Sequence, residues 1–176
     1  MFGPSVYPPQ PKSVTALAWG NSPWPVSSGE DRYRRSLYTF SKRTAPFAAY
    51  LVFNSPTGEN CVARRNRSNT PLQALTILND EMYGELAQAA AELALSQNYG
   101  TDREIAVDLF RRFLTRIPQA SEVDSLLEFK RKQLNRLSTE ELKAQEILGT
   151  QSDNQRAVWT LVARALMSLD EVITKP

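Results

Sequence analysis

A helix start at Thr70 divides the sequence into two parts of different character. Thr70 is a favoured N-cap residue, Pro71 suits the first helical position because its φ is preset, and Gln73 completes a Thr-x-x-Gln capping box. Before this joint the chain is rich in proline and aromatic residues, and after it the sequence has helical periodicity almost to its end. We therefore predict a mainly α fold, an irregular helical bundle over residues 70–176 that follows a proline-rich, mostly extended N-terminal segment.

Residues 1–29 contain six prolines and three glycines, a density that excludes a long helix. This segment is either a polyproline-type ligand for an aromatic-lined groove or an extended arm that lies on its own domain. Tyr7, Trp19 and Trp24 favour the arm, because isolated linkers seldom carry such large apolar side chains. We predict an extended arm over residues 1–29.

Residues 30–69 form a basic, aromatic segment that we expect to pack on the bundle. Within it we predict a helix over 32–42, with a strand over 37–40 as the alternative. Apolar residues at 48–53 predict a short buried extended piece, and the composition of 54–58 predicts a turn. The inner face of the predicted helix over 32–42 would carry Tyr33, Leu37 and Phe40.

Beyond Thr70, apolar residues recur at the i, i+3, i+4 and i+7 spacing of helices that face a core. The predicted helices cover 71–78, 81–97, 101–115, 121–137, 138–148 and 154–168. Thr101 with Glu104, Ser121, and Ser138 with Glu141 are the expected N-terminal caps. The predicted core residues include Leu72, Leu75 and Leu78 in the first helix, Met82, Leu86, Ala89, Ala90 and Leu93 in the second, and Val158, Leu161, Val162, Ala165, Leu166 and Leu169 in the last.

Charge is unevenly distributed along the chain. Residues 30–67 carry eight Lys or Arg against three Asp or Glu, a net charge of +5, whereas residues 68–176 carry twelve against sixteen, a net charge of −4. Attraction between the two parts is one consequence. A nucleic-acid interface with Trp19, Trp24 and Tyr38 as stacking groups is the weaker interpretation, because the positive excess is local and the following helices are acidic. We therefore expect no nucleic-acid partner.

The residue inventory excludes several catalytic and cofactor-binding chemistries. The chain has no histidine, which excludes Ser-His-Asp and Cys-His catalysis and His-ligated zinc or haem. Cys61 is the only cysteine, so neither an internal disulfide nor a Cys-rich metal site can form. Adjacent carboxylates such as Asp170 and Glu171 diverge by about 100° on a helix and do not make an acid–base pair. We expect no catalytic residue, metal or cofactor in this chain, and no transmembrane segment, because the longest apolar run spans only 47–53.

Several motifs occur in the order typical of one family. They are Gly3-Pro-Ser-Val-Tyr-Pro-Pro-Gln-Pro11, Arg34-Arg-Ser-Leu-Tyr38, Lys42-Arg-Thr44, Cys61 with Arg64-Arg65, Asn69-Thr-Pro-Leu-Gln-Ala-Leu-Thr-Ile-Leu-Asn-Asp80, Arg116-Ile-Pro118 with Glu122, and Leu169-Asp-Glu171. On these motifs, almost the whole chain resembles the C-terminal planctomycete-specific domain of unknown function. The sequence departs from the family pattern at Phe2, Asn54, Ser68, Glu81 and Ser168, where glycine, aspartate, threonine, proline and asparagine are usual.

The resemblance implies one domain of a large exported protein, preceded by another planctomycete domain and often by a cytochrome-c-like module. It therefore implies a periplasmic or extracellular location, a chain that begins inside a domain, and upstream domains of the parent protein as partners. No signal peptide follows Met1. We expect a non-catalytic interaction or structural domain; the alternative is part of a glycan-acting enzyme whose site is completed by upstream domains.

The arginines near the joint predict a site for sulfate, phosphate or a uronic acid of an anionic glycan. A helix N-terminus offers unpaired N–H groups and the positive end of the helix dipole, and arginine binds such anions well. The alternative is that the arginines pair with internal carboxylates such as Asp80, Glu85 or Asp170. The predicted anion site consists of Arg34, Arg35, Arg43, Arg64, Arg65, Arg67 and Thr70.

Overall fold

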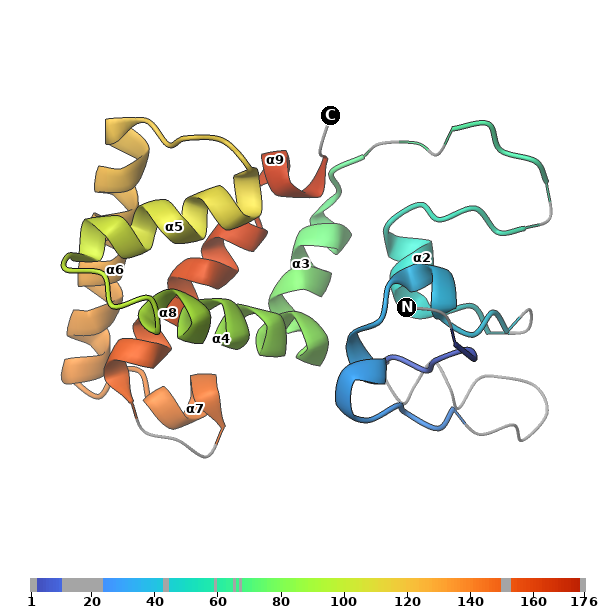
Figure 1. Cartoon of the computed structure of the whole chain (residues 1–176), viewed down its shortest axis with the longest axis horizontal. Helices are drawn as coiled ribbons and strands as arrows, with labels where there is room; N and C mark the ends of the chain where they lie inside the picture. Colours follow the sequence, from blue (N-terminus) through green and yellow to red (C-terminus); the bar gives the residue numbers. More distant parts are fainter. Residues whose placement is uncertain are drawn as a thin grey trace. The chain divides into compact units, whose positions relative to one another are not determined.

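The computed structural model describes residues 3–10, 24–42, 45–58, 60–64, 66, 68–149 and 153–174. The chain divides into two compact units, Met1–Thr76 and Ile77–Pro176, which we call the N-terminal and C-terminal units and describe separately. Helices dominate the described residues, and none of these residues belongs to a β-strand, so the predicted mainly α fold is confirmed (Figure 1). The division falls inside helix α3 (Pro71–Asn79), later than the boundary predicted at residue 70.

The C-terminal unit is built around helix α8 (Asn154–Met167) (Figure 1). It contacts α4, α5, α6, α7 and α9. Eight of its fourteen residues are buried, so this helix is enclosed on nearly all sides. The surrounding helices are α4 (Glu81–Leu95), α5 (Asp102–Leu114), α6 (Ala120–Ser138), α7 (Ala144–Leu148) and α9 (Asp170–Ile173).

Helix α4 packs on α8 through alanines rather than through the predicted stripe. Ala87, Ala91 and Ala94 are fully buried, whereas Leu86 and Leu93 are 38% and 46% exposed. The predicted core face of this helix is therefore wrong. Alanine lets two helix backbones approach closely, and α4 is apolar on both faces, so hydrophobic periodicity alone could not select the buried one.

Helix α3 shows the same shift of its buried face. Gln73 and Ile77 are buried, at i and i+4, while Leu72 and Leu75 are more than half exposed and Leu78 is 38% exposed. The prediction that the three leucines face the core is wrong. Gln73 is buried because its amide donates hydrogen bonds to the carbonyl oxygen of Val52, at 2.9 Å, and to the hydroxyl of Ser68, at 3.1 Å.

Two predicted helix caps in the C-terminal unit are wrong. Helix α6 is capped at Gln119, whose backbone N–H donates to the Glu122 carboxylate at 2.7 Å and whose carbonyl oxygen accepts from the Glu122 N–H at 3.1 Å, so Ser121 lies inside the helix. At the other end Ser138 is still helical, and its hydroxyl donates to the carbonyl oxygen of Leu134. Helix α7 therefore begins only at Ala144. The cap at Thr101 does form, because Thr101 and Glu104 make the reciprocal bonds of a capping box.

The N-terminal unit contains only short helices before α3. They are the 3₁₀ turns η1 (Gly29–Tyr33) and η2 (Ser36–Tyr38) and helix α2 (Ala48–Val52). The predicted helix over 32–42 is wrong, because this stretch holds only the two short 3₁₀ turns. Val6 donates its N–H to the carbonyl oxygen of Tyr38 and accepts from the N–H of Phe40, which keeps Thr39 extended. The predicted extended piece over 48–53 is also wrong, since a short apolar run does not distinguish strand from helix.

Aromatic contacts hold the described part of the N-terminal arm within its own unit. The ring of Tyr7 contacts Trp24 and Phe40, each with 5.1 Å between ring centres. Trp24 stacks on Phe47 at 6.1 Å and donates its indole N–H to the carbonyl oxygen of Pro8 at 2.8 Å. Trp19 and residues 11–23 as a whole lie outside the described residues.

The close packing of α4 on α8 predicts that a larger side chain on the buried face of α4 destabilises the fold. Ala91→Leu inserts three carbon atoms into a fully buried position, so we expect the free energy of unfolding to fall by about 1–3 kcal/mol. Ala89→Leu is the matched control, because Ala89 is exposed on the same helix and the change should stay within about 0.5 kcal/mol. Urea unfolding followed by helical circular dichroism measures both. Equal destabilisation by the two substitutions would contradict the observed helix orientation.

Candidate functional site

The predicted anion site is only partly within the described residues. Arg43, Arg65 and Arg67 lie outside them. Arg34 is described, and its guanidinium contacts the Asp31 carboxylate at 3.2 Å, the Pro4 carbonyl oxygen at 3.2 Å and the ring of Tyr38 at 5.0 Å. Arg34 therefore fastens the extended arm to the turn that follows it.

Glycine at position 3 leaves room for this arginine. A Cβ atom at Gly3 would lie 2.5 Å from one terminal nitrogen of Arg34 and 2.7 Å from the other. The Gly-Pro-Ser motif and Arg34, which both belong to the family resemblance, thus depend on each other through packing.

The other described members of the predicted site serve separate parts of the N-terminal unit. Arg35 is exposed and precedes η2. Arg64 is exposed at a hollow of about 270 Å³, whose lining also includes Asn54, Asn60 and Asn66. Thr70 accepts from the N–H of Gln73 at 3.3 Å and donates its own N–H to the Gln73 side chain at 2.9 Å. The N–H of Gln73, in the first turn of α3, therefore already has an acceptor within the helix. The anion site stays a prediction.

A larger hollow of about 530 Å³ lies against α2 in the N-terminal unit. Its lining combines aromatic rings with hydroxyl groups, a combination suited to polar organic ligands. The hydroxyl of Tyr50 donates to the carbonyl oxygen of Ser36, which fixes the ring at the edge of this hollow. The lining residues are Ser41, Lys42, Pro46, Phe47, Tyr50, Leu51, Ser55, Pro56, Thr57 and Gly58.

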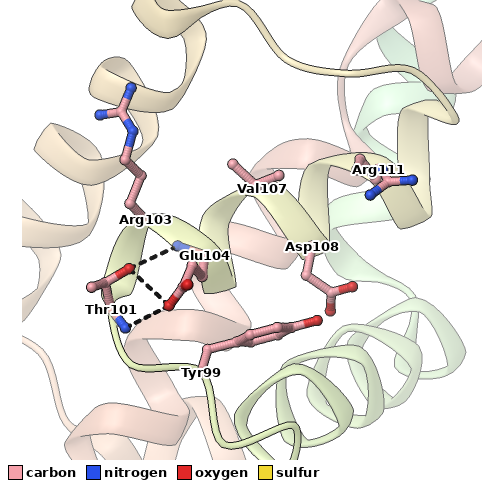
Figure 2. Close-up of a pocket in the computed structure, with 7 residues that line it drawn as sticks. All are labelled: Tyr99, Thr101, Arg103, Glu104, Val107, Asp108 and Arg111. Carbon is pink, nitrogen blue, oxygen red and sulfur yellow. Dashed lines mark hydrogen bonds between the residues drawn. The ribbon is translucent and has the colours of Figure 1, made fainter.

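A second pocket, of about 350 Å³, lies along α5 in the C-terminal unit (Figure 2). The ring of Tyr99 lies beside the helix with its hydroxyl pointing toward Asp108, and Arg111 projects from the next turn (Figure 2). The lining carries Glu104 and Asp108 as well as Arg103 and Arg111. This mixed charge favours neither an anionic nor a cationic ligand. Sequence reasoning did not identify this pocket.

Arg116 joins three helices of the C-terminal unit. Its guanidinium donates to both carboxylate oxygens of Glu122, at 2.9 and 2.6 Å, and to both of Glu171, at 2.7 and 2.9 Å. The same group lies over the ring of Phe110, 4.8 Å from its centre. Phe110 is in α5, Glu122 in α6 and Glu171 in α9, so the contacts of Arg116 connect these three helices. We call the ion-paired residues Arg116, Glu122 and Glu171 the Arg116 clamp.

Mutual hydrogen bonding keeps all three members of the Arg116 clamp charged. Arg116 and the backbone N–H of Gln119 hold the pKa of Glu122 at about 2, below its ordinary value of 4.5. Hydrogen bonds from Arg116 also lower the pKa of Glu171, and the two carboxylates raise the pKa of Arg116. A carboxylate with such a lowered pKa is a poor general base at neutral pH, so the clamp is suited to holding helices together.

The residue before the clamp arginine has an unusual backbone. Thr115 ends α5 with φ at +61°, in the left-handed region that a β-branched residue rarely adopts. Its N–H donates to the carbonyl oxygen of Arg111 at 2.9 Å, which closes the helix. This conformation turns the chain out of α5, and the bonds of Arg116 help to offset its strain.

Lys130, whose side chain is buried, makes a second junction between helices, which sequence reasoning missed. It is only 6% exposed, its ammonium lies 2.5 Å from the Asp102 carboxylate, and it lies 5.2 Å from the ring centre of Trp159. Its burial could have been inferred from spacing, because position 130 lies seven residues from both Val123 and Leu137, which are also buried on α6.

Within the described residues, no group of three or more His, Cys, Asp or Glu could hold a metal ion. None of the described helices has both the length and the apolar character needed to cross a bilayer. Cys61 is exposed.

The lowered pKa of Glu122 predicts a specific loss of stability in acid. A carboxyl group whose pKa is lower in the folded state stabilises the fold above its unfolded pKa, and this stabilisation disappears as pH falls through the folded pKa. We therefore expect the free energy of unfolding to decrease from about pH 4.5 to about pH 2. Glu122→Gln should lower stability at pH 7 and flatten this decrease.

The matched control is Glu146→Gln, since Glu146 is exposed and forms no ion pair with the described residues. Urea unfolding of wild type and both variants at several pH values in that window measures the effect. A wild-type pH profile retained in full by Glu122→Gln would contradict the role of the clamp.

The family PSD1, described as "Protein of unknown function (DUF1553)", matches residues 1–130, which include the N-terminal unit, α4, α5, the Arg116–Glu122 pair and part of α6. No curated protein and no solved structure matches the chain. The matched range covers well over half of the 176 residues. The chain therefore belongs to the PSD1 family of proteins of unknown function.

Proposed function

We propose that the chain is a non-catalytic interaction domain of a larger, exported multidomain protein. The observation that carries this proposal is the outer face of α4, which we define as Met82, Leu86, Ala89 and Leu93. Leucines on this face are 38% and 46% exposed although they repeat at the spacing of a helix interface. Contiguous exposed apolar surface of this kind is typical of protein–protein contact sites.

The roles of the motif residues support a non-catalytic function. Arg116, Glu122 and Glu171 bind one another, and Thr70 with Gln73 caps α3. Their hydrogen-bonding groups are used to hold elements together. Polar groups that act on a substrate are instead exposed in a cleft and matched to its chemistry.

The resemblance to planctomycete domains supports the exported, multidomain setting and implies upstream domains of the same parent protein as partners. Such a partner would cover the exposed apolar side chains of the C-terminal unit. Interfaces between domains of one chain commonly bury apolar surface of this kind within a more polar contact area.

Extending the chain upstream within its gene tests this proposal. We expect the longer protein to melt at a higher temperature and to bind less of a dye that reports exposed apolar surface, because the added domain covers that surface. Differential scanning calorimetry and dye fluorescence measure the two quantities. An unchanged melting temperature together with unchanged dye binding would contradict the proposed role.

One observation favours a second candidate function, part of a glycan-acting protein. The hollow of about 530 Å³ combines Phe47 and Tyr50 with the hydroxyl groups of Ser41 and Ser55. Aromatic rings stack on sugar faces while hydroxyl groups exchange hydrogen bonds with them. Lys42 lines the same hollow, so a uronic acid or a sulfated sugar is the favoured class.

Thermal shift with heparin-like oligosaccharides and with sulfate tests the second candidate. Tyr50→Ala should abolish stabilisation by the oligosaccharide, whereas Arg64→Ala tests the predicted arginine site in the same assay. Leu37→Ala is the control, because Leu37 is 81% exposed and does not line the hollow, so this change should leave the stabilisation by the oligosaccharide intact. Stabilisation no greater than that of sodium chloride at equal ionic strength would exclude both anion sites.

A further inference from the structure

We propose that the pocket along α5 binds a small aromatic carboxylate, with Tyr99 contacting the ring of the ligand and Arg111 its carboxylate group. The pocket holds about 350 Å³, at the lower end of the range of about 300–1,000 Å³ that is typical of small-ligand sites. None of its lining residues belongs to the outer face of α4 or to the hollow beside α2. The inference therefore does not depend on the proposed interaction function.

The pocket lies between one turn of the chain and one face of α5. Asn98 has φ at +53°, in the left-handed region that asparagine tolerates, and the chain turns here before Tyr99, whose ring lies beside the helix (Figure 2). The next residues are fixed by the capping box, in which the N–H of Thr101 donates to the Glu104 carboxylate at 2.9 Å. The walls are thus preformed, which lowers the ordering cost of binding.

Tyr99 and Val107 supply the apolar surface of this pocket. Tyr99 is 38% exposed, and its hydroxyl makes no hydrogen bond with the residues that the structure describes. Val107 lies one helical turn from Arg111, so an apolar group and a cationic group adjoin on the same face of α5. A flat ring that packs against the tyrosine, with an anionic group toward Arg111, matches this order of groups.

Ion pairs and capping bonds within the fold determine which charges of the lining are available to a ligand. Three of the four charged side chains already have partners. These are Glu104 with Thr101 at 3.0 Å, Arg103 with Asp124 at 2.8 Å, and Asp108 with Arg112 at 2.7 Å. Arg111 is exposed, and its guanidinium forms no ion pair or hydrogen bond with the described residues. A ligand can therefore bind Arg111 without breaking an existing contact, and a carboxylate matches the planar guanidinium.

The two acidic side chains of the lining select against other classes of ligand. Glu104 and Asp108 place negative charge on the pocket wall, so a phosphate ester with up to two negative charges meets more repulsion than a singly charged carboxylate. A cationic ligand would be repelled by Arg111 and would have to share carboxylates that are already bound within the fold. The aromatic monocarboxylate is therefore the class that we infer.

Three probes of similar shape and different charge provide the first test. They are 3-phenylpropanoate, its uncharged amide, and 3-phenylpropylammonium, each titrated into the ¹⁵N-labelled 176-residue chain. The carboxylate should shift backbone amide resonances within residues 99–111, with a dissociation constant on the order of 1 mM because the pocket is open to solvent. The other two probes should bind at least about tenfold more weakly. Equal or tighter binding of the amide or the ammonium would overturn the proposal.

A charge variant tests the role of Arg111. Arg111→Gln should weaken binding of 3-phenylpropanoate by about tenfold and leave binding of the amide probe unchanged, because only the charged contact is lost. Arg131→Gln is the matched control, since Arg131 is exposed on α6 and does not line the pocket, and it should leave both affinities unchanged. An unchanged affinity of Arg111→Gln for the carboxylate would overturn the proposal.

A second variant tests the aromatic contact. Tyr99→Leu keeps an apolar side chain but removes the ring, so it should weaken binding of the carboxylate and of the amide by the same factor, about threefold or more. Undiminished binding by this variant would contradict the contact with Tyr99. If either variant fails to fold, the three probes on the wild-type chain decide the question, and shifted amides confined to residues outside 99–111 would overturn the proposal.

Discussion

Burial of α8 on nearly all sides determines how the C-terminal unit is assembled. A helix enclosed in this way must be met by neighbours in several directions, and α4, α5, α6, α7 and α9 supply them. The contact with α4 uses alanine, and the side facing α6 includes Trp159 beneath the Lys130 ammonium. The size of the side chains at each contact helps to set the distance of the neighbouring helix.

The Arg116 clamp completes this arrangement at the end of α5. Helix α9 has only four residues and contains no buried residue, so apolar packing alone would hold it weakly. Helix α9 is held instead by Glu171, whose carboxylate shares the Arg116 guanidinium with the carboxylate of Glu122. The planar guanidinium of arginine suits such a paired contact. The sequence motifs around residues 116 and 169, far apart along the chain, are joined by this single side chain.

Local patterns predicted the existence and order of the long helices well, because capping residues and periodicity act within a few positions. They failed where the answer depends on partners distant in the chain. Periodicity selected Leu86 and Leu93 for the core, but α8 accepts only the alanine face of α4. Likewise, an amphipathic pattern over 32–42 predicted a helix, but pairing with Val6 keeps Thr39 extended and the stretch forms only short 3₁₀ turns.

The candidate sites show the same division between local and distant effects. The capping bonds of Thr70 were predictable because Gln73 is three residues away, whereas the roles of Arg34 and Arg116 depend on groups across the fold. Charge adjacency in sequence suggested a shared arginine site. Among the described arginines of that site, Arg34 is instead held by Asp31 and by the carbonyl oxygen of Pro4, while Arg35 and Arg64 are exposed elsewhere in the N-terminal unit.

The position of Trp159 gives the C-terminal unit an internal optical probe. Its ring is fully buried, its indole N–H has no hydrogen-bond acceptor among the described residues, and a lysine ammonium lies over its face. An indole in such dry surroundings fluoresces at short wavelength and shifts to longer wavelength when water reaches it. Trp24 belongs to the other unit and donates its indole N–H to a backbone carbonyl oxygen. Replacing Trp159, or replacing Trp19 together with Trp24, would therefore let the light emitted by one unit be followed without the other.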